Sequence, residues 1–494
     1  MSTILIFAFV AIVLIGVLGV IGRRRPVRDL SEWTVGGRRY GAFTMWFLQA
    51  GEVFTTFTFL GLAGLAFSGG VAVFYSLPYI PLGYAVLFFL ARRVWTLGKQ
   101  RGYLTQGDFL EDRFDSKLLG TLSAIIGVVF VLPYLQLQIT GLGLIVNLVT
   151  GDATSATLSM VIGCLFVIVF VLWTGLRGVA STSYFKDAIM LIVLVVLVIA
   201  IPTHFAGGIS GIFHKVAQLH PSMLVLHAGS HDQTWFITNM FVSAIGVGFI
   251  CLPHSWPGIF AAKSPKALRR NYAFLPLYEL TVLIPIIIGF AAILVLSPKT
   301  NPNGILLSLS QHTLPTWATG FVVMAGIATA MVPAAGILIA ISSLVARNIA
   351  RVRNERLQFW VNHGTVVVAV GFSLLLGIFL PNALANLLLL TYTGLCQLAP
   401  ANILGLTKRR LVGKVPVIVG MVAGIVVVIL LTFVFKTLFG TFDVGLVGLG
   451  VNLVIVAVGA GIERMVGATP QQRPETSDSD GNSDDSDSSE VVTA

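Results

Sequence analysis

The sequence predicts an all-α protein that crosses a lipid bilayer many times. Of its 494 residues, 56% are hydrophobic and only 11% are charged, and the mean hydropathy is +0.91. Soluble domains have about a quarter charged residues, and a membrane-spanning helix needs about 20 mostly apolar residues. Thirteen stretches have about that length, and no stretch sustains the period-two alternation of a membrane β-barrel. We therefore expect a polytopic helical membrane protein with thirteen transmembrane helices.

The first apolar stretch has the length of a secretory signal peptide. It lacks a basic start and a small-residue cleavage site, and Arg23, Arg24 and Arg25 follow it, so we expect a retained helix. The thirteen expected spans cover residues 4–22, 42–68, 70–97, 118–149, 153–175, 178–203, 234–252, 272–297, 315–350, 357–380, 382–407, 415–438 and 443–463.

Basic residues predict the orientation of these spans in the cell membrane. If the N-terminus lies outside, 27 of the 31 Lys and Arg residues fall on the cytoplasmic side and three fall outside, with Lys186 inside a span. This asymmetry follows the positive-inside rule and places the C-terminus in the cytoplasm. The net charge of +10 is spread over every inner connection without a nucleic-acid-binding motif, so we expect no nucleic-acid partner.

The C-terminal residues 465–494 are predicted to form a disordered acidic tail. From Pro474 onward the chain has seven of its 21 acidic residues and almost nothing apolar. Regulation by phosphorylation is an alternative role for this tail. The three cysteines, Cys164, Cys251 and Cys396, fall in predicted helices without metal-ligand spacing, so we expect packing residues and neither a disulfide nor a metal site.

Two expected spans contain polar and helix-breaking residues at mid-membrane depth. The second span reads TMWFLQAGEVFTTFTFLGLAGLAFSGG, and the seventh runs into SAIGVGFICLPHSW. Close packing of small residues is one interpretation. Two interrupted helices at matched positions are typical of transporters built from inverted repeats, with their site near the bilayer centre. The predicted repeats cover residues 42–203 and 234–407, with an extra helix in 1–22 and two peripheral helices in 415–464.

The charged residues inside the apolar spans include Glu52, Lys186, Asp187 and Glu279. A charge at a helix centre costs about 2.5–3.5 kcal/mol on insertion scales, so it normally faces a cavity or a partner. Lys186 lies nine residues after Arg177 at the cytoplasmic end, so snorkelling toward the interface is an alternative.

Several segments together resemble a known transporter family. They are FTFLGLAGLAFSGG, TGLRGVASTSYFKDA, PHSWPGIFAAKSPKALRRN, ISSLVARNIAR, DLSEWTVGGRRYGAFTMWFL, RGYLTQGDFLEDRF, LPYLQLQITGLGLIV and ALRRNYAFLPLY. Across about residues 28–410 the chain resembles the sodium:solute symporters, and within them the bacterial monocarboxylate permeases. The resemblance implies a LeuT-type core of five plus five helices. It also implies secondary active import of small organic solutes, with short-chain monocarboxylates such as acetate, lactate or pyruvate expected.

The resemblance also locates the family's sodium site between the first and eighth core helices. It implies ligand positions at the carbonyl groups of Gly51 and Phe54 and at Thr329. The family's two hydroxyl ligands correspond here to Val332 and Pro333, which offer no side-chain oxygen. A hard cation needs several oxygen ligands, so the sequence argues against sodium coupling and favours H+ as the coupling ion.

Lys186 and Asp187 stand where the family usually has Thr-Asp, on a core helix that passes the sodium site. A lysine in that cavity can replace the missing ion, and it can load and release a proton when burial and a nearby carboxylate oppose each other. Adjacent helical residues lie about 100° apart, so both side chains are not expected to face one point. We expect Lys186 to face the cavity with Glu52, and Asp187 to assist. The alternative is a fixed ion pair that joins helices.

The resemblance implies substrate contacts from six positions on the core helices. They are Thr58, Tyr134, Gln138, Gly248, Phe249 and Gln397. A carboxylate substrate would use helix N-termini and side-chain donors, including Lys186, although polar residues in spans also join helices. Glu279 has no assigned role. His254 and His363 are expected at the cytoplasmic surface.

Other functions fit the sequence less well. About 30 residues follow the last span, too few for a signalling domain, and no catalytic or metal-binding motif is present, so we expect no enzyme, no catalytic residue, no metal site and no cofactor. Paired interrupted helices favour alternating access over a channel. A sodium-coupled symporter of another solute such as an amino acid, or a membrane sensor on the same fold, remains the alternative. No partner protein is inferred.

Overall fold

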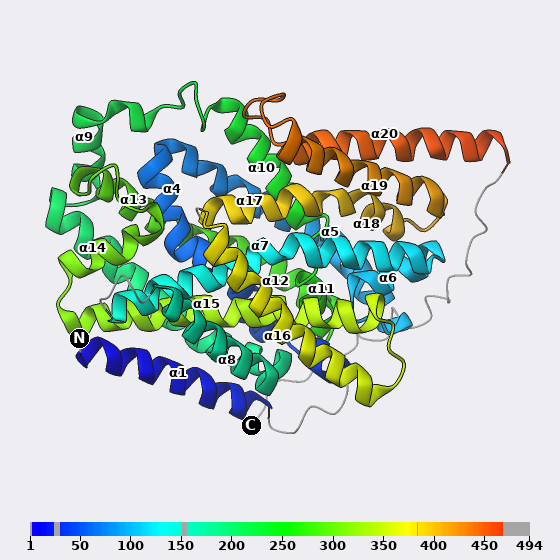
Figure 1. The fold of residues 1–494 in the computed structure, drawn as a ribbon, viewed down its shortest axis with the longest axis horizontal. Helices are drawn as coiled ribbons and strands as arrows, with labels where there is room; N and C mark the ends of the chain where they lie inside the picture. The colour runs from blue at the N-terminus through cyan, green and yellow to red at the C-terminus, as the bar shows by residue number, and fades with distance from the viewer. Residues whose placement is uncertain (1, 24–29, 151–155, 383, 468–494) are drawn as a thin grey trace, which may run out of the picture.

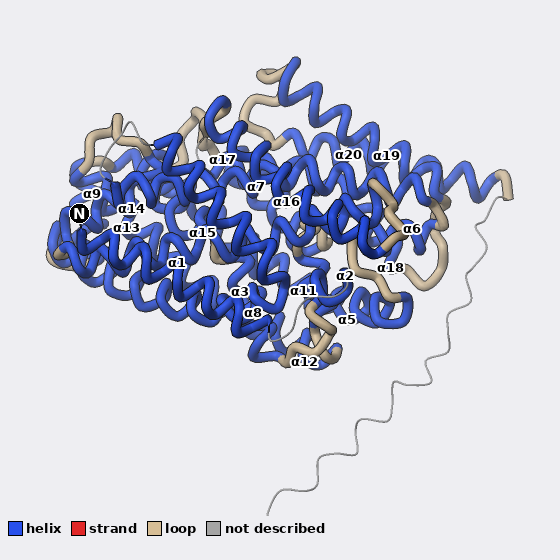
Figure 2. Tube along the Cα trace, turned by 60° about the horizontal axis from the view of Figure 1, so that its bottom comes forward, coloured by secondary structure: helices blue, strands red, loops and turns tan. Residues whose placement is uncertain are grey.

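The computed structural model describes residues 2–23, 30–150, 156–382 and 384–467. In this part of the chain every regular element is a helix, and one isolated backbone bridge joins Tyr40 and Ala262. Most of the long helices run roughly along one direction (Figure 1). A second view shows that the loops lie mainly at the ends of the helices (Figure 2). The prediction of an all-α membrane protein is confirmed.

The first half of the chain forms a run of helices with several short segments between them. These are α1 (Ser2–Arg23), α2 (Leu30–Val35), α3 (Ala42–Val53), η1 (Phe57–Gly61), α4 (Leu62–Gly69), η2 (Gly70–Tyr75), α5 (Ser76–Arg101), α6 (Gln106–Phe114), α7 (Lys117–Thr150), α8 (Ala156–Ala206), α9 (Ile209–Leu219) and η4 (Pro221–Leu224).

The second half continues in the same way. It forms α10 (Gln233–Gly248), α11 (Ser255–Ala261), α12 (Pro265–Tyr278), η5 (Glu279–Val282), α13 (Leu283–Val295), η6 (Pro302–Gly304), α14 (Ile305–Thr313), α15 (Thr316–Leu344), η7 (Val345–Ile349), α16 (Glu355–Phe379), α17 (Leu384–Leu395), η8 (Cys396–Leu398), α18 (Ala399–Leu406), α19 (Lys414–Ile429), η9 (Leu430–Val434) and α20 (Val444–Met465).

Ten helical segments in the described residues are long and apolar enough to cross a bilayer, against thirteen predicted spans. One of the ten covers the 50 residues of Thr157–Ala206, about 75 Å at 1.5 Å per residue, which is too long for one crossing. It bends at Gly175, whose φ of 57° and ψ of −169° are not helical. That position separates the predicted spans 153–175 and 178–203. The predicted span 234–252 is not among the ten, and the count of thirteen is not confirmed.

The two predicted helix interruptions are both present. After α3, Phe54 is extended, with φ of −82° and ψ of 90°, and regular structure resumes at Phe57. After α10, Ile250 has a φ of 56°, and α11 begins at Ser255. Cys251 therefore lies in the second interruption and not in a helix as predicted.

Two further interruptions were not predicted from the sequence. The short helix η5 separates α12 from α13, and η8 separates α17 from α18. All three cysteines, in the described chain, are free and buried, in agreement with their expected packing role.

The helix α15 lies at the centre of the bundle. Every residue from 322 to 344 is buried, and the helix packs against α1, α3, α7 and α8. Its many Ala and Gly residues allow neighbouring backbones to approach closely. In contrast, α19 and α20 pack against each other beside the main bundle (Figure 1). They expose apolar residues such as Val454 and Val458, as expected of lipid-facing helices. The predicted tail lies outside the described residues from 468 onward.

Candidate functional site

The first helix interruption supplies two backbone carbonyl groups that no helix uses. The backbone N–H of Phe54 donates to Ala50, and α3 ends there. The next N–H groups turn elsewhere: Thr56 donates to Gln138 Oε1 at 3.2 Å, and Phe57 donates to Thr55 Oγ1 at 3.2 Å. The carbonyl groups of Gly51 and Phe54 therefore remain available to an outside partner.

Lys186 from α8 is that partner. Its Nζ donates to Gly51 O at 3.0 Å and to Phe54 O at 2.8 Å, and it forms an ion pair with Asp187 Oδ1 at 2.8 Å. Both Lys186 and Asp187 have 0% exposed side chains. An ammonium group has three N–H donors, so this lysine has one acceptor for each of them.

Asp187 has a second partner, which the sequence did not indicate. The hydroxyl of Tyr278, the last residue of α12, donates to Asp187 Oδ1 at 3.2 Å. The Tyr278 ring also lies edge-on to Phe54, with centroids 5.1 Å apart. The pair on α8 is thus held by the interruption after α3 on one side and by the end of α12 on the other.

The expectation that Lys186 and Asp187 do not face one point is wrong, because their charged groups are in contact at 2.8 Å. The 100° separation describes the directions of the Cβ atoms, whereas four methylene groups allow the lysine ammonium to turn back toward its neighbour. The expected partner Glu52 forms no ion pair within the described residues, and Lys186 has no free donor for it. The snorkelling alternative is also excluded in this structure, because the ammonium is completely buried.

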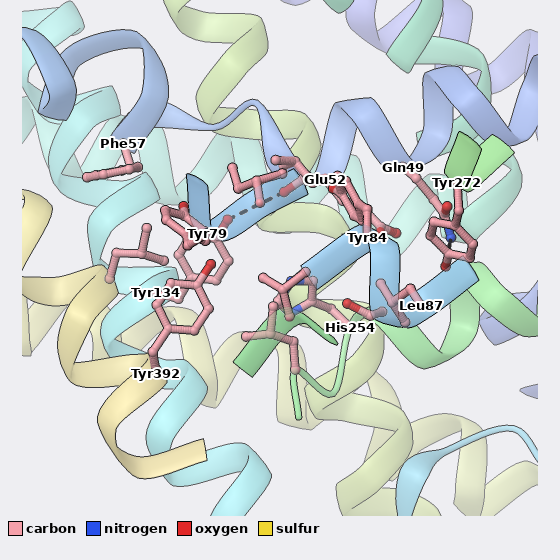
Figure 3. Close-up of a pocket in the computed structure, with 16 residues that line it drawn as sticks. Gln49, Glu52, Phe57, Tyr79, Tyr84, Leu87, Tyr134, His254, Tyr272 and Tyr392 are labelled. Atoms are coloured by element: carbon pink, nitrogen blue, oxygen red, sulfur yellow. Dashed lines mark hydrogen bonds between the residues drawn. The ribbon is translucent and has the colours of Figure 1, made fainter. Parts of the chain in front are cut away.

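A cavity opens beside the same interruption, between α3, α5, α7, α12, α17 and the segment that follows α10 (Figure 3). The cavity is small, with a volume of about 40 Å³. Five tyrosine rings line it, and Figure 3 shows them on several sides of the cavity, with Glu52 at one wall. The tyrosines are Tyr79, Tyr84, Tyr134, Tyr272 and Tyr392.

The cavity is rich in neutral hydrogen-bond donors. Gln49 Nε2 donates to the Tyr272 hydroxyl at 2.9 Å, which leaves the hydrogen of that hydroxyl for another acceptor. The Tyr84 hydroxyl is buried and has no partner in the described chain. The two rings are neighbours, with centroids 5.9 Å apart. The lining includes His254 but neither Lys nor Arg.

His254 was expected at the cytoplasmic surface, and the structure corrects this. It is 4% exposed, lines the cavity, and lies 5.4 Å from the Tyr134 ring between centroids. The interruption after α10 turns the chain inward before α11 begins, so a residue at the end of an apolar stretch becomes internal. His363 on α16 is intermediate in exposure and stacks near Phe359, with centroids 3.8 Å apart.

The remaining predicted cation-site positions lie on the central helix α15. Thr329, Val332 and Pro333 are all buried there, and the Thr329 hydroxyl donates to Gly326 O at 2.9 Å, within its own helix. At this site the carbonyl groups of the interruption contact the lysine ammonium.

The structure places one of the six predicted substrate residues, Tyr134, in the cavity lining. Gln138 and Thr58 instead form hydrogen bonds with the backbone of the first interruption. Gln138 Oε1 accepts from the N–H of Thr56, and the Thr58 hydroxyl donates to Val53 O at 3.2 Å. Gly248 faces Gly83 where α10 and α5 approach closely.

The other two predicted substrate residues also lie outside the lining. The carbonyl of Phe249 accepts from Asn402 at 2.9 Å, and Gln397 Nε2 donates to Gly445 O of α20 at 2.8 Å. The other four tyrosines of the lining, Tyr79, Tyr84, Tyr272 and Tyr392, were missed. Their concentration in otherwise apolar spans is the signal that the sequence offered.

An interrupted-helix bundle with a buried charge at the interruption and an adjoining polar cavity defines a membrane transporter of the LeuT-type fold. The profile of the sodium:solute symporter family matches residues 33–424, and this chain belongs to that family. It is a multi-pass membrane protein.

Relatives match along most of the chain. The uncharacterized symporter YhjB of Bacillus subtilis (strain 168) is 33% identical over 473 residues, which cover 92% of this chain and 96% of the relative. A monocarboxylate transport permease protein of Rhizobium johnstonii (strain DSM 114642 / LMG 32736 / 3841) is 28% identical over 414 residues, or 81% and 82% of the two chains.

A solved structure confirms the fold. A Na+-coupled sialic acid symporter in a substrate-bound outward-open state superposes with a TM-score of 0.78 and 17% identity, covering 96% of this chain and 99% of that one. At this identity the likeness shows the fold alone.

Proposed function

We propose that this chain is a sodium-independent, proton-coupled importer of small monocarboxylates, in which the Lys186 ammonium occupies the position of a coupling cation. The observation that supports this most directly is the contact of Lys186 Nζ with the carbonyl oxygens of Gly51 and Phe54, at 3.0 and 2.8 Å. Transport itself follows from the family. The ion and the substrate class are the proposal.

The absence of a sodium requirement follows from competition for oxygen ligands. A hard cation must gather several oxygens to replace its hydration shell. Here the lysine uses the two carbonyl groups of the interruption and one oxygen of Asp187, and Val332 and Pro333 add no hydroxyl. The positive charge that a sodium ion would bring is already present, so the interrupted helix needs no ion to be stabilised.

The chemistry of the cavity supports an anionic substrate of small size. Tyr84 and Tyr272 can both donate a hydroxyl hydrogen, and hydrogen bonds to a charged acceptor contribute about 1.5–3 kcal/mol each. The wall near the interruption is aromatic and apolar, which suits a short carbon chain. The name of the Rhizobium relative, which specifies monocarboxylate transport, agrees with this class.

The test is uptake by the purified full chain in liposomes. Labelled pyruvate, lactate and acetate are offered with a pH gradient, acidic outside, in sodium buffer and in choline buffer at equal osmolarity. We expect accumulation of at least one of the three acids, driven by the pH gradient and equal in the two buffers. A sodium gradient without a pH gradient should drive no accumulation.

Two results would contradict the proposal. Uptake that disappears in choline buffer shows that a sodium site exists elsewhere in the protein. Uptake of proline and not of the three acids favours an amino acid substrate. More distant relatives of this chain, from Staphylococcus aureus, are named sodium/proline symporters.

A further inference from the structure

Glu52 is a carboxyl group in the cavity that has no assigned partner. It is 8% exposed, lies one residue before the end of α3, and forms part of the cavity wall in Figure 3. Its Oε1 atom is buried and has no hydrogen-bond partner in the described part of the chain. Glu279 is also buried and its Oε1 also lacks a partner there, but Glu279 does not line the cavity. The buried Asp187, in contrast, has two partners at its Oδ1.

The surroundings of Glu52 close it off on two sides and leave it open toward the cavity. A Cβ added to Gly258 of α11 would lie 3.4 Å from Glu52 Oε2. A Cβ added to Gly336 of α15 would lie 3.9 Å from Glu52 Cγ. Both neighbouring helices therefore present bare backbone to this side chain. The carboxyl fits between them, at the mouth of the first interruption.

Among the charged groups of the site, Glu52 is the one without a counter-charge. Lys186 and Asp187 carry opposite charges in contact at 2.8 Å, so together they are neutral. All three lysine donors are used, so Lys186 cannot donate to Glu52. Deprotonating Lys186 would leave two N–H donors for three buried acceptors, so one acceptor would lose its partner at a cost of about 1–3 kcal/mol. This makes Lys186 a fixed cation.

We propose that Glu52 is the proton-binding group of the transport cycle, and that its neutral carboxyl donates a hydrogen bond to the carboxylate of the substrate in the cavity. This inference rests on the proposed function. One proton is taken up with one monocarboxylate, and it lies between two carboxyl groups that would otherwise repel each other. Both leave toward the cytoplasm, and the net charge of the site is restored.

Other ionisable groups lie in the cavity lining or on the elements around it and must be distinguished from Glu52. They come from α5, α7, α8, α12, α17, η5 and the segment after α10. They are Tyr79, Tyr84, Tyr134, Lys186, Asp187, His254, Tyr272, Glu279 and Tyr392. His254 is the main competitor as a proton carrier, because it lines the same cavity and its buried Nδ1 has no partner in the described residues.

The experiment compares Glu52→Gln, Glu52→Asp and His254→Gln in liposomes. The probe is labelled pyruvate, or the member of the acetate, lactate and pyruvate set that the unmodified protein accumulates best. Three quantities are measured: accumulation of the probe driven by a pH gradient, counterflow exchange of the probe from about pH 5.5 to about pH 7.5, and proton entry with the probe, followed by a dye trapped in the lumen.

Glutamine keeps the shape and a hydrogen-bond donor but cannot release a proton. We expect Glu52→Gln to exchange the probe at all pH values, with KM changed by no more than about tenfold, the worth of one hydrogen bond. It should lose accumulation driven by the pH gradient and the accompanying proton entry. Glu52→Asp and His254→Gln should both retain accumulation and proton entry, each with a changed KM because both residues line the cavity.

The outcomes separate this inference from the proposed function. Proton-driven accumulation by Glu52→Gln overturns the role of Glu52 and leaves the proposed function in place. Loss of proton entry in His254→Gln, with accumulation kept by Glu52→Gln, assigns the proton to the histidine instead. Loss of exchange in both Glu52 variants, at normal amounts of folded protein, makes Glu52 structural. Accumulation by the unmodified protein that needs sodium overturns the proposed function, and this inference with it.

Discussion

Lys186 and Asp187 are two buried charges, and their contacts with each other and with their neighbours offset the free-energy cost of burying them. Burying an unpaired charge costs several kcal/mol, and both side chains have no exposed surface. The structure offsets this cost with the ion pair, the two carbonyl groups at the interruption, and the Tyr278 hydroxyl. Each charge is therefore tolerated only because the other is present.

This dependence predicts an unusual pattern of stabilities. Lys186→Met should lower the free energy of unfolding by about 3–5 kcal/mol, because Asp187 loses its cation. The double variant Lys186→Met with Asp187→Leu should recover a large part of that loss. Thermal unfolding in detergent, followed by size-exclusion chromatography, measures both.

The control for this prediction is Lys215→Met, which removes an exposed lysine on α9 and should leave stability unchanged. The loss of unfolding free energy in the double variant is also compared with the losses in Lys186→Met alone and in Asp187→Leu alone. If it equals their sum, the two residues act independently. That result would contradict the ion pair as the reason for their burial.

At the scale of elements, interruptions position the site more than regular helices do. The end of α3 frees the carbonyl groups for Lys186, the segment after α10 brings His254 into the cavity, and η5 follows directly on Tyr278. A fourth break, at Gly175, divides α8 and determines how the half that contains Lys186 lies against the bundle.

Gly175 predicts a specific stability effect. Its φ of 57° and ψ of −169° fall in a region that only glycine adopts easily, and a methyl group there would lie 3.2 Å from the Trp33 ring. Gly175→Ala should therefore destabilise the protein by about 1–3 kcal/mol. Thermal unfolding in detergent is again the measurement.

Gly364 of α16 provides the matched control. It is helical, and a methyl group added there would meet no other atom within 4 Å. Gly364→Ala should stabilise the helix by about 0.5–1 kcal/mol. Equal effects of the two substitutions would show that the break at Gly175 does not need glycine.

At the scale of the whole molecule, charge asymmetry predicts orientation. If the N-terminus lies outside, 27 of the basic residues fall on the inner side and three on the outer side, which predicts an outside N-terminus and a cytoplasmic C-terminus. The three native cysteines are buried, so an introduced cysteine can report its side of the membrane. We expect Lys215→Cys to react with an impermeant maleimide in intact cells.

Lys408→Cys, in the connection between α18 and α19, should react only after the cells are opened. Labelling of Lys408→Cys in intact cells, with Lys215→Cys protected, would reverse the topology. The unmodified protein serves as the control and should remain unlabelled in both conditions.

The acidic tail gives a second prediction at this scale. Its composition provides almost no apolar surface for contact with the bundle. Deletion of residues 474–494 should therefore leave the rate of substrate uptake unchanged at equal protein in the membrane. Lost uptake by the truncated chain would instead assign the tail a role in transport.

The sequence by itself determined the fold class, the first two interruptions and the presence of a lysine and an aspartate inside an apolar span. These properties are local: a bilayer demands apolar length, a buried charge demands a partner, and Gly, Thr and Pro weaken a helix wherever they occur.

Tertiary structure alone decided the partner of Lys186, because the tip of a long side chain is placed by the groups around it and not by its position on the helix. It also decided the cavity, whose five tyrosines come from α5, α7, α12 and α17, and it placed Gln397 against α20. Contacts between elements so far apart in the chain leave no periodic signal in the sequence, because each residue satisfies its own helix equally well whichever neighbour it meets.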